Sequence, residues 1–400
     1  MIKNKKILIV SECFYPEEFK INDVASSWVE KGYSVDVLTL TPSYPLGKIF
    51  SGYKNGLLQK DEYKGVKIFR VFAVTGYKNN IFKKILKYIN FMILGSIVGI
   101  FIGKRYDCVF GFNAGPLTNM LPVVIIRKLY KKRAMFWVQD VWPESVYAYG
   151  FKKTKIFSIF LNAFVKFMHN NISSIAISSK GFKTKLEPYT KKNLKFLYAP
   201  NWADDLNMNL DPISFSNVKK TQFTFAGNIG KVQNLENIIK AYNLITNEYK
   251  KKSQLNIIGD GSNLNNLKKL SKNNSNIVFY GKKNREDMAK YYIASDFLII
   301  SLIDQPIFSL TVPAKTQTYI AAKKPILAII KGDVADIVKD NNLGICADPS
   351  NLHNIKEAFI KCINMPNHEK SKFIINNSKL LNTTFNKDQV ISELANKLVS

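Results

Sequence analysis

The sequence predicts an α/β protein with two doubly wound parallel sheets, and three observations support this. Short apolar segments that favour strands alternate with helical segments along all 400 residues, a pattern typical of parallel α/β domains. Residues 201–220 are rich in Asp, Asn, Ser and Pro and divide the alternating segments into two series. The length suits two domains of ordinary size, and a hydrophobic content of 46% is enough for a core in each.

Each strand is predicted from a short run of apolar, often β-branched residues. In the first half these runs are Ile7–Val10, Val35–Leu40, Val66–Val71, Cys108–Phe112, Ala134–Val138, Ser174–Ile177 and Phe196–Tyr198. In the second half they are Phe223–Ala226, Leu255–Ile258, Ile277–Phe279, Phe297–Ile300, Ile326–Ile329 and a short one at Ile345. We therefore predict an N-terminal domain over residues 1–200, a linker over 201–220, a C-terminal domain over 221–385 and a final helix over 386–400 that can cross back to the first domain.

The formal net charge of +28 has one neutral explanation and two functional ones. The neutral explanation is an AT-rich genome, whose codons favour Lys and Asn. The functional ones are binding to nucleic acid and binding to an anionic membrane surface. Because the sequence has no zinc-ligand spacing, no recognition-helix motif and no RNP-type aromatic strand, we favour the membrane over nucleic acid.

Two apolar helical segments lie among basic residues. The segment Ile85–Gly103 just reaches the length of a spanning helix and is flanked at each end by a pair of basic residues. Strands of one sheet are predicted on both sides of it, which argues against a span. It is therefore either a buried helix or a helix that exposes an apolar face to the inner leaflet. The segment Phe151–Asn170 either extends that face or packs as an ordinary amphipathic helix.

The first apolar run and the cysteines bear on the compartment. Ile7–Val10 is too short for the core of a signal peptide. The four cysteines, Cys13, Cys108, Cys346 and Cys362, have neither disulfide nor metal-ligand spacing. We therefore expect a cytoplasmic protein that is peripheral on the inner face of the plasma membrane.

Several turns of the second half are suited to phosphate binding. In Gly227–Lys231 a strand ends in glycines shortly before a helix that begins near Asn234, and Lys231 adds a positive charge. The strand ends Gly259–Gly261 and Phe279–Gly281 follow, and then a loop runs into a helix at Lys315. Each turn alone is explained equally well by the needs of a tight turn, but their succession in one domain predicts a nucleotide-binding site.

The order of these motifs resembles glycosyltransferase family 4, whose members are retaining enzymes of the GT-B fold, with two Rossmann-like domains facing each other across a cleft. The second-half motifs are Gly-Asn-Ile-Gly-Lys (227–231), Ile-Gly-Asp-Gly (258–261), Phe-Tyr-Gly (279–281), Ala-Ser-Asp (294–296) and Phe-Ser-Leu-Thr-Val-Pro-Ala-Lys (308–315). In the first half Phe14–Asp23, Leu38–Thr39 with Pro42–Pro45, and Trp137–Ser145 agree. The string Gln-Asp-Val-Trp-Pro-Glu-Ser (139–145) is similar to an element of L-fucosamine transferases from O-antigen and capsule gene clusters.

The resemblance implies a donor site in the second half and an acceptor side in the first. The implied donor-binding residues are Gly227, Asn228, Gly230, Lys231, Gly259, Tyr280, Gly281, Phe308, Ser309, Leu310, Thr311, Lys315, Gln317 and Thr318. Asp140 matches the place of a polar catalytic-side residue. Asn22, Asp23 and Glu144 would face the acceptor or the diphosphate.

The sequence departs from the family at several positions. Leu310 and Thr318 stand where many members carry two glutamates, so contacts with ribose and sugar hydroxyls must come from residues such as Gln317 or Thr318. Asn228 and Gln233 stand where an Arg–Lys pair is usual. No Asp-X-Asp occurs in the chain, so we expect no metal and no other cofactor. Lysines, backbone amides and helix dipoles would then stabilise the leaving diphosphate.

We therefore predict a metal-independent, retaining glycosyltransferase with a nucleotide-sugar donor. By resemblance the donor is UDP-linked, with an N-acetylated 6-deoxyhexosamine such as L-FucNAc as the sugar. The predicted acceptor is an undecaprenyl-diphosphate-linked oligosaccharide of O-antigen (lipopolysaccharide) or capsule assembly. In a front-face reaction the leaving phosphate would take the acceptor proton and Asp140 would orient the acceptor hydroxyl; alternatively, Asp140 caps the next turn.

Two other functions stay open at this point. The missing glutamates motivate a catalytically degenerate scaffold of polysaccharide assembly. A sugar-nucleotide epimerase needs acid–base histidines, and only His169, His353 and His368 exist. A dinucleotide dehydrogenase is disfavoured, because no Gly-X-Gly-X-X-Gly follows the first strand.

Overall fold

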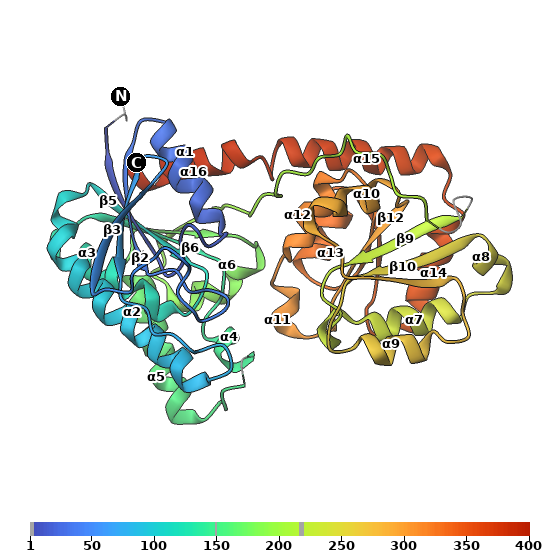
Figure 1. The fold of residues 1–400 in the computed structure, drawn as a ribbon, viewed down its shortest axis with the longest axis horizontal. Helices are drawn as coiled ribbons and strands as arrows, with labels where there is room; N and C mark the ends of the chain where they lie inside the picture. Colours follow the sequence, from blue (N-terminus) through green and yellow to red (C-terminus); the bar gives the residue numbers. More distant parts are fainter. Residues whose placement is uncertain (1–3, 149, 216–219) are drawn as a thin grey trace. The chain divides into compact units, whose positions relative to one another are not determined.

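A computed structural model of the protein describes residues 4–148, 150–215 and 220–400. The chain divides into two compact units, which we call unit 1 (Met1–Pro200 with Asp388–Ser400) and unit 2 (Asn201–Lys387). Each unit is a mostly or wholly parallel sheet covered by helices (Figure 1). The predicted linker, residues 201–220, groups with unit 2, and its residues 216–219 lie outside the described part of the chain.

Unit 1 has an eight-stranded sheet in the order β3-β4-β2-β1-β5-β6-β7-β8. Its strands are β1 (Lys6–Ser11), β2 (Ser34–Leu40), β3 (Leu58–Tyr63), β4 (Val66–Val71), β5 (Cys108–Asn113), β6 (Arg133–Val138), β7 (Ser174–Ile177) and β8 (Lys195–Tyr198). All neighbours pair in parallel except β3 and β4, which form an antiparallel hairpin. The strands predicted for the first half are confirmed, but β3 was missed because its residues, Leu-Gln-Lys-Asp-Glu-Tyr, are mostly polar, as an edge strand permits.

Unit 2 has a six-stranded, all-parallel sheet in the order β11-β10-β9-β12-β13-β14. The strands are β9 (Thr221–Ala226), β10 (Ser253–Ile258), β11 (Ile277–Gly281), β12 (Phe297–Ser301), β13 (Ile326–Ile329) and β14 (Gly344–Ala347). Every strand predicted for the second half is present. The sheet separates two buried apolar clusters, one centred on Phe223, Tyr242 and Phe359 and the other on Leu298, Tyr319 and Val338.

Helices connect the strands and cover the faces of both sheets. In unit 1 they are α1 (Lys20–Glu30), α2 (Ile81–Ile102), α3 (Leu121–Tyr130), α4 (Glu144–Ala148), α5 (Lys155–Asn170), α6 (Gly181–Leu186) and α16 (Lys387–Val399). In unit 2 they are α7 (Leu235–Asn243), α8 (Asn247–Lys251), α9 (Leu264–Leu270), α10 (Met288–Ile293), α11 (Pro306–Ser309), α12 (Ala314–Ala321), α13 (Asp333–Asp340), α14 (Leu352–Ile363) and α15 (Asn367–Asn382).

Helix α2 is the long apolar segment seen in the sequence. Its small residues Gly95, Gly99 and Gly103 face Pro122 and Ile126 at and beyond the start of α3, where a Cβ on Gly103 would lie only 2.8 Å from Ile126. Together with the 3-10 helix η1 (Gly103–Arg105) it forms the one helical stretch, among the residues the structure describes, that is long and apolar enough to cross a membrane, and about two thirds of its most apolar part is not buried. Because it joins β4 to β5 of one sheet, it is a crossover helix of unit 1.

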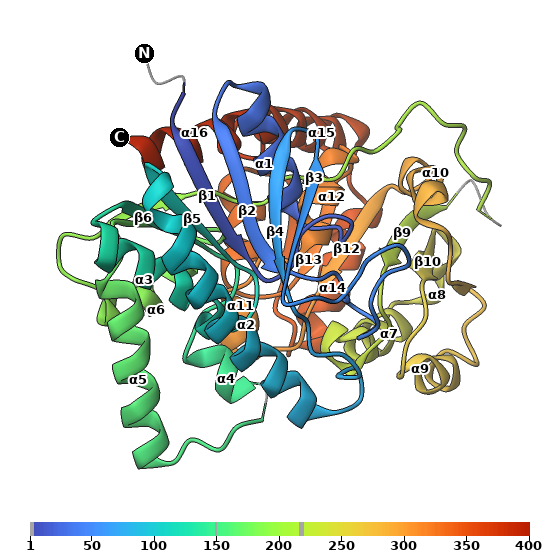
Figure 2. The ribbon, with the colours of Figure 1, turned by 60° about the vertical axis from the view of Figure 1, so that its left-hand side comes forward.

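The last helix, α16, packs onto unit 1 although it follows unit 2 in the chain. It lies beside α1 in both views (Figures 1 and 2). Trp28 Nε1 of α1 donates a hydrogen bond to the carbonyl of Ile391 over 3.0 Å. Ile391, Leu394 and Leu398 are buried, so the helix completes an apolar layer of unit 1.

Replacing Leu394 by Ala tests whether α16 is an integral part of unit 1. The side chain is fully buried, so its truncation should lower the free energy of unfolding by about 2–5 kcal/mol. Asn396→Ala, on the exposed side of the same helix, is the control and should change it little. Urea unfolding followed by tryptophan fluorescence measures both variants. Equal midpoints would mean that α16 adds nothing to unit 1.

Candidate functional site

The switch point of the unit 2 sheet lies between β9 and β12. From β9 the chain proceeds to β10 and β11 on one side and then returns to β12 on the other. All six residues of β9 pair with β10, whereas only Phe223 and Thr224 pair with β12. Beyond Thr224 the backbone of Ala226 bonds instead to Tyr319 of α12, whose hydroxyl lies 3.2 Å from Ala226 N and 3.3 Å from Ala226 O. Open α/β sheets bind ligands at such a point, outside the carboxyl ends of the strands.

Lys315 lies at this switch point, one helical turn before Tyr319. Its Nζ is 3.8 Å from the centroid of the Phe225 ring and has no hydrogen-bond partner among the described residues. A Cβ built on Gly227 would lie 3.2 Å from Nζ, so the sequence-predicted Gly227 and Lys315 are neighbours. Burial of the ammonium group lowers the pKa of Lys315 to about 7.

Two hydroxyl groups of β12 and α12 are also buried without a hydrogen-bond partner among the described residues. They are Oγ of Ser301, the last residue of β12, and Oγ1 of Thr316 in the first turn of α12. Buried polar atoms normally have hydrogen-bond partners. An ammonium group and two hydroxyls left unpaired beside a sheet switch point therefore mark a site prepared for a polar ligand.

Glycines allow the loops after the strands to lie against one another. Gly259 has φ +137°, and a Cβ there would lie 1.9 Å from the carbonyl oxygen of Gly227. Gly227 N donates to Ile258 O over 2.9 Å, and Ile229 N donates to Asp260 O over 2.8 Å. Only residues without a Cβ permit this approach, so the loops after β9 and β10 form one rigid wall of the site.

The other predicted donor-site residues lie in three places. Asn228 and Lys231 are exposed in the loop after β9, where Gly230 N donates to Gln233 Oε1 over 3.0 Å. Phe308 and Ser309 belong to α11, and Leu310 and Thr311 follow it. This segment lies against the loop after β13, since a Cβ on Gly332 would lie 2.0 Å from Ser309 O.

The side chains of Tyr280, Gln317 and Thr318 have partners within unit 2. Tyr280 is partly buried and packs edge-on against Phe215, with ring centroids 5.4 Å apart. Gln317 is buried, and its amide nitrogen, in the orientation that satisfies it, donates to the carbonyls of Pro313 and Ala314. Thr318 Oγ1 donates to Ala314 O over 3.1 Å. Both side chains thus bond back to carbonyls at the start of α12, as hydroxyls and amides within a helix can.

In unit 1, Asp140 and Glu144 follow β6. Burial raises the pKa of Asp140, and hydrogen bonds from Ser145 and from the amide of Val141 offset part of this rise. Burial likewise raises the pKa of Glu144, whose Oε2 has no partner among the described residues. These raised pKa values make both carboxyl groups able to exchange protons nearer neutrality than an exposed carboxyl group.

Asn22 and Asp23 lie in the first turn of α1, which begins at Lys20 after the loop that follows β1. Asn22 Oδ1 accepts from Tyr15 N over 3.1 Å, and Asn22 Nδ2 donates to Glu17 O over 2.7 Å. The side chain of Asn22 therefore shapes this loop, and its contact with an acceptor stays a prediction. Asp23 is partly buried in the first turn of α1.

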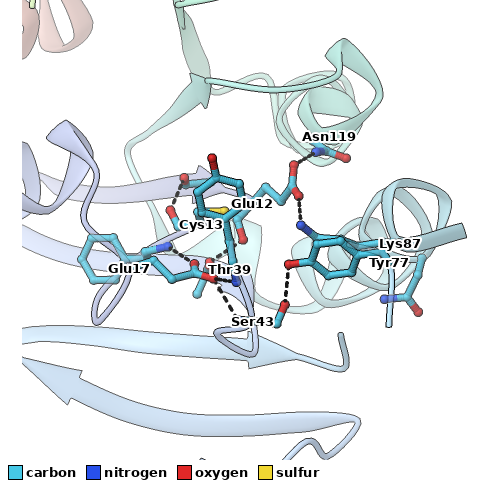
Figure 3. Close-up of polar contacts among 12 residues, drawn as sticks. Glu12, Cys13, Glu17, Thr39, Ser43, Tyr77, Lys87 and Asn119 are labelled. Atoms are coloured by element: carbon cyan, nitrogen blue, oxygen red, sulfur yellow. Dashed lines mark hydrogen bonds and ion pairs between the residues drawn. The ribbon is translucent and has the colours of Figure 1, made fainter. Parts of the chain in front are cut away.

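The structure reveals a buried polar cluster that the sequence analysis missed, at the carboxyl ends of β1, β2 and β5. Lys87 of α2 forms an ion pair of 2.5 Å with Glu12, and Asn119 Nδ2 donates to the other oxygen of Glu12 over 2.5 Å (Figure 3). Beside them, Glu17 accepts from the backbone of Phe14, Ser43 and Tyr44 over 2.7–3.2 Å. The one signal in the sequence was a lysine interrupting the apolar segment Ile85–Gly103.

His169 is the one buried histidine among the described residues, and the placement of acidic, His and Cys side chains decides whether they could hold a metal ion. His169 is buried in α5, its Nδ1 lies 3.0 Å from Val165 O, and burial lowers its pKa to about 4. Within residues 4–148, 150–215 and 220–400, no group of three or more His, Cys, Asp and Glu side chains is placed to hold a metal ion.

Comparisons with known proteins show a similarity in sequence over much of unit 2 and a similarity in fold over almost the whole chain. Residues 209–380 match the family model described as "Glycosyl transferases group 1". "Probable glycosyltransferase WbjE" of Pseudomonas aeruginosa is 24% identical over 259 residues, which are 62% of this chain and 64% of that protein. The match therefore spans less than two thirds of the length of this relative.

Two solved structures have the same fold over almost the whole chain. Sucrose-phosphate synthase from Thermosynechococcus elongatus has a TM-score of 0.71 and 13% identity, with 98% of each chain covered. Anabaena HepE in complex with UDP and glucose has a TM-score of 0.64 and 12% identity, with 98% of this chain and 99% of that chain covered. The fold is thus that of GT-B glycosyltransferases, as predicted, and residues 209–380 are similar in sequence to the glycosyl transferases group 1 family.

Gly259→Ala tests the rigid wall formed by the loops after β9 and β10. A Cβ at Gly259 would overlap the carbonyl of Gly227, so this variant should lose several kcal/mol of stability or displace the loop. Gly281→Ala is the matched control, because Gly281 also has a positive φ, +66°, but has nothing within 4 Å of its Cβ position. Its cost should be only about 1 kcal/mol. Thermal unfolding measures both, and similar melting temperatures would contradict the close approach.

Proposed function

We propose that this protein is a glycosyltransferase that transfers a sugar from a nucleotide-sugar donor to a lipid-linked acceptor. The observation that carries the proposal is the buried, unpartnered ammonium group of Lys315 at the switch point of unit 2, beside the glycine loops after β9 and β10. A diphosphate supplies the negative charge that this site lacks. The match of residues 209–380 to a glycosyltransferase family model supports the same conclusion.

The donor is a nucleoside diphosphate sugar, and we propose UDP as the nucleotide. HepE, which shares the fold, binds UDP and glucose. Phe279–Gly281 at the end of β11 would present backbone groups to the base. The transferred sugar that we propose, an N-acetylated 6-deoxyhexosamine such as L-FucNAc, rests on the string Gln139–Ser145 alone.

In the mechanism that we propose, no metal takes part. Breaking the bond between the anomeric carbon and the diphosphate leaves negative charge on the phosphate oxygen. Lys315, the exposed Lys231 and the amides at the start of α12 would stabilise that charge. With retention of configuration, the acceptor oxygen attacks from the side the diphosphate leaves, and its proton passes to the departing phosphate oxygen. Asp140 would orient the acceptor hydroxyl.

The acceptor side of the proposal rests on the surface of α2 and α5 in unit 1. Phe82 and Phe101 of α2 are 72% and 76% exposed, and Ile156 and Phe160 of α5 are 83% and 73% exposed. Both views place α2, α3 and α5 along one side of unit 1 (Figures 1 and 2). We call the exposed apolar residues of α2 and α5 the apolar face.

Charge favours an anionic lipid surface as the partner of this face. Residues 72–106 and 151–186, which contain the two helices, include many lysines and no Asp or Glu. Exposed apolar side chains rimmed by basic residues bind the interface of anionic membranes. We therefore propose that the protein is peripheral on the cytoplasmic leaflet, where an undecaprenyl-diphosphate-linked oligosaccharide of O-antigen or capsule assembly would be presented.

Stabilisation against heat by UDP-, GDP- and TDP-sugars tests the donor site. One nucleotide family should raise the melting temperature by mass action, and Lys315→Met should abolish the shift. Lys324→Met is the matched control, because Lys324 is also a largely buried lysine of unit 2 but donates to Ile293 O over 2.7 Å, before β13. If no nucleotide sugar shifts melting, the protein is a scaffold and the proposal is wrong.

Binding of the same UDP-sugars should also depend on pH. In the free protein the pKa of Lys315 is lowered to about 7, and a bound diphosphate favours the charged form, so binding takes up a proton above pH 7. The affinity should be highest below pH 7 and should fall as pH rises, by at most about tenfold per pH unit. Titration calorimetry between pH 6 and 8.5 measures the affinity of the protein for the UDP-sugar. A flat profile for the wild type, or a slope retained in Lys315→Met, would exclude this role.

Vesicle binding tests the apolar face. The double variant Phe101→Ser/Phe160→Ser should weaken binding to phosphatidylglycerol vesicles, since each phenylalanine contributes about 1.5–3 kcal/mol on burial. High salt should weaken the wild type, and neutral phosphatidylcholine vesicles should bind less. The control is Leu244→Ser/Ile375→Ser, which removes two exposed apolar residues of unit 2. If both double variants sediment equally with the vesicles, the apolar face does not bind the membrane.

A further inference from the structure

The sheet of unit 1 has its own switch point, between β1 and β5. From β1 the chain proceeds to β2 and β4 on one side and later to β5 on the other. β1 pairs in parallel with both β2 and β5, so the segments that follow β1 and β5 are neighbours at the carboxyl edge. Glu12 directly follows β1, and Asn119 lies in the 3-10 helix Leu117–Met120 after β5. Their hydrogen bond joins the two sides of the switch point.

Glu12 is held there from two directions, as Figure 3 shows. Lys87 Nζ lies 2.5 Å from Oε1, and Asn119 Nδ2 lies 2.5 Å from Oε2. Lys87 is 4% exposed and also lies over the ring of Tyr77 at 4.4 Å, whereas Glu12 keeps 13% of its side chain exposed. Gly115 allows the loop after β5 to approach, since a Cβ there would be 3.1 Å from Oε2. The Glu12 carboxylate is therefore held in place by Lys87 and Asn119, and it is more exposed to solvent than the Lys87 ammonium group.

The chemistry around Glu12 selects the kind of ligand. Each carboxylate oxygen has bonding capacity beyond the one donor it already has. Asn119 also has its Oδ1 buried without a partner in the part of the chain that the structure describes, as has Oγ1 of Thr118, which precedes it in the chain. Glu17, the second carboxyl group of the cluster, lies beside it. Two carboxyl groups and one lysine disfavour a phosphate, whereas unfilled acceptors favour a neutral ligand with hydroxyl groups to donate.

We propose that Glu12 binds a hydroxyl group of the acceptor sugar, and that Lys87 is the positioning residue that holds its carboxylate in place. The proposal rests on the proposed function and extends it to the acceptor subsite. Lys87 belongs to the inward side of α2, whose outward side carries the apolar face. One helix thus serves both parts of a lipid-linked sugar: its outer side contacts the membrane and its inner side orders the group that binds the sugar.

The donor in this test is the UDP-sugar that raises the melting temperature of the protein, carrying a radioactive sugar. The acceptor is lipid extracted from cells that lack this protein, and the radioactivity transferred to that lipid is measured. Glu12→Gln should raise the amount of lipid needed for half-maximal labelling by about tenfold or more, because the sugar hydroxyl then bonds to a neutral amide oxygen instead of a carboxylate. Stabilisation by the UDP-sugar should be unchanged. Glu12→Gln/Lys87→Met removes both charges at nearly constant volume, so that a fold defect caused by an unpaired Lys87 is avoided. It should show the same weak use of the lipid.

Two further variants separate positioning from mere stability. Lys87→Arg should restore near-normal half-saturation, whereas Lys87→Met should raise it. Asp36→Asn is the control, because Asp36 accepts from Tyr106 over 2.6 Å, ahead of β5 and away from the switch point. It should lower the melting temperature without changing half-saturation.

The outcomes distinguish this proposal from the one on which it rests. If Glu12→Gln and the double variant use the lipid as well as Asp36→Asn does, Glu12 does not bind the acceptor and the proposal is overturned, while the transferase function stands. If the wild type neither gains stability from any UDP-sugar nor labels any lipid, the proposed function itself fails, and the acceptor subsite with it.

Discussion

Parallel pairing around two switch points is the constraint on which the rest of this structure depends. In a parallel sheet every strand ends at the same edge, so loops far apart in the chain meet there. In unit 2, β9 pairs with β10 along its length but with β12 at only two residues. The resulting gap in backbone pairing is what admits Tyr319 and Lys315 of α12. In unit 1, β1 is flanked by β2 and β5, which brings Glu12 to Asn119.

Two buried lysines illustrate how the surroundings decide what a residue can do. Burial alone would lower the pKa of Lys87, but the attraction of Glu12 outweighs it and raises the pKa. Lys87 is therefore a permanent cation that is already paired. Lys315 is buried without any such partner, and its pKa falls to about 7. A paired lysine stabilises an arrangement within the protein, whereas an unpaired one still has its charge to offer to a ligand.

Helix α2 connects the surface of unit 1 with its interior. Its glycine stripe lies against α3, and its buried lysine reaches the switch point. Its remaining side is apolar and exposed, which is uncommon in a protein that does not bind a membrane or a partner. The hydrophobic residues that make this segment resemble a membrane-spanning helix therefore belong to a helix that connects two strands of one sheet.

The sequence by itself determined the fold class, the strand positions and the glycine-containing turns, because these depend on local apolar periodicity and on the backbone freedom of glycine. It did not reveal β3, whose polar edge position hides the strand pattern. It placed Gly227 and Lys315 in one site, but it also placed Gln317 and Tyr280 there, whose side chains the structure shows to be engaged elsewhere. Only the tertiary structure could decide this, because helix rotation and burial set the direction of a side chain. The pair Glu12–Lys87 depended on tertiary structure entirely, since a contact across 75 residues leaves no local pattern.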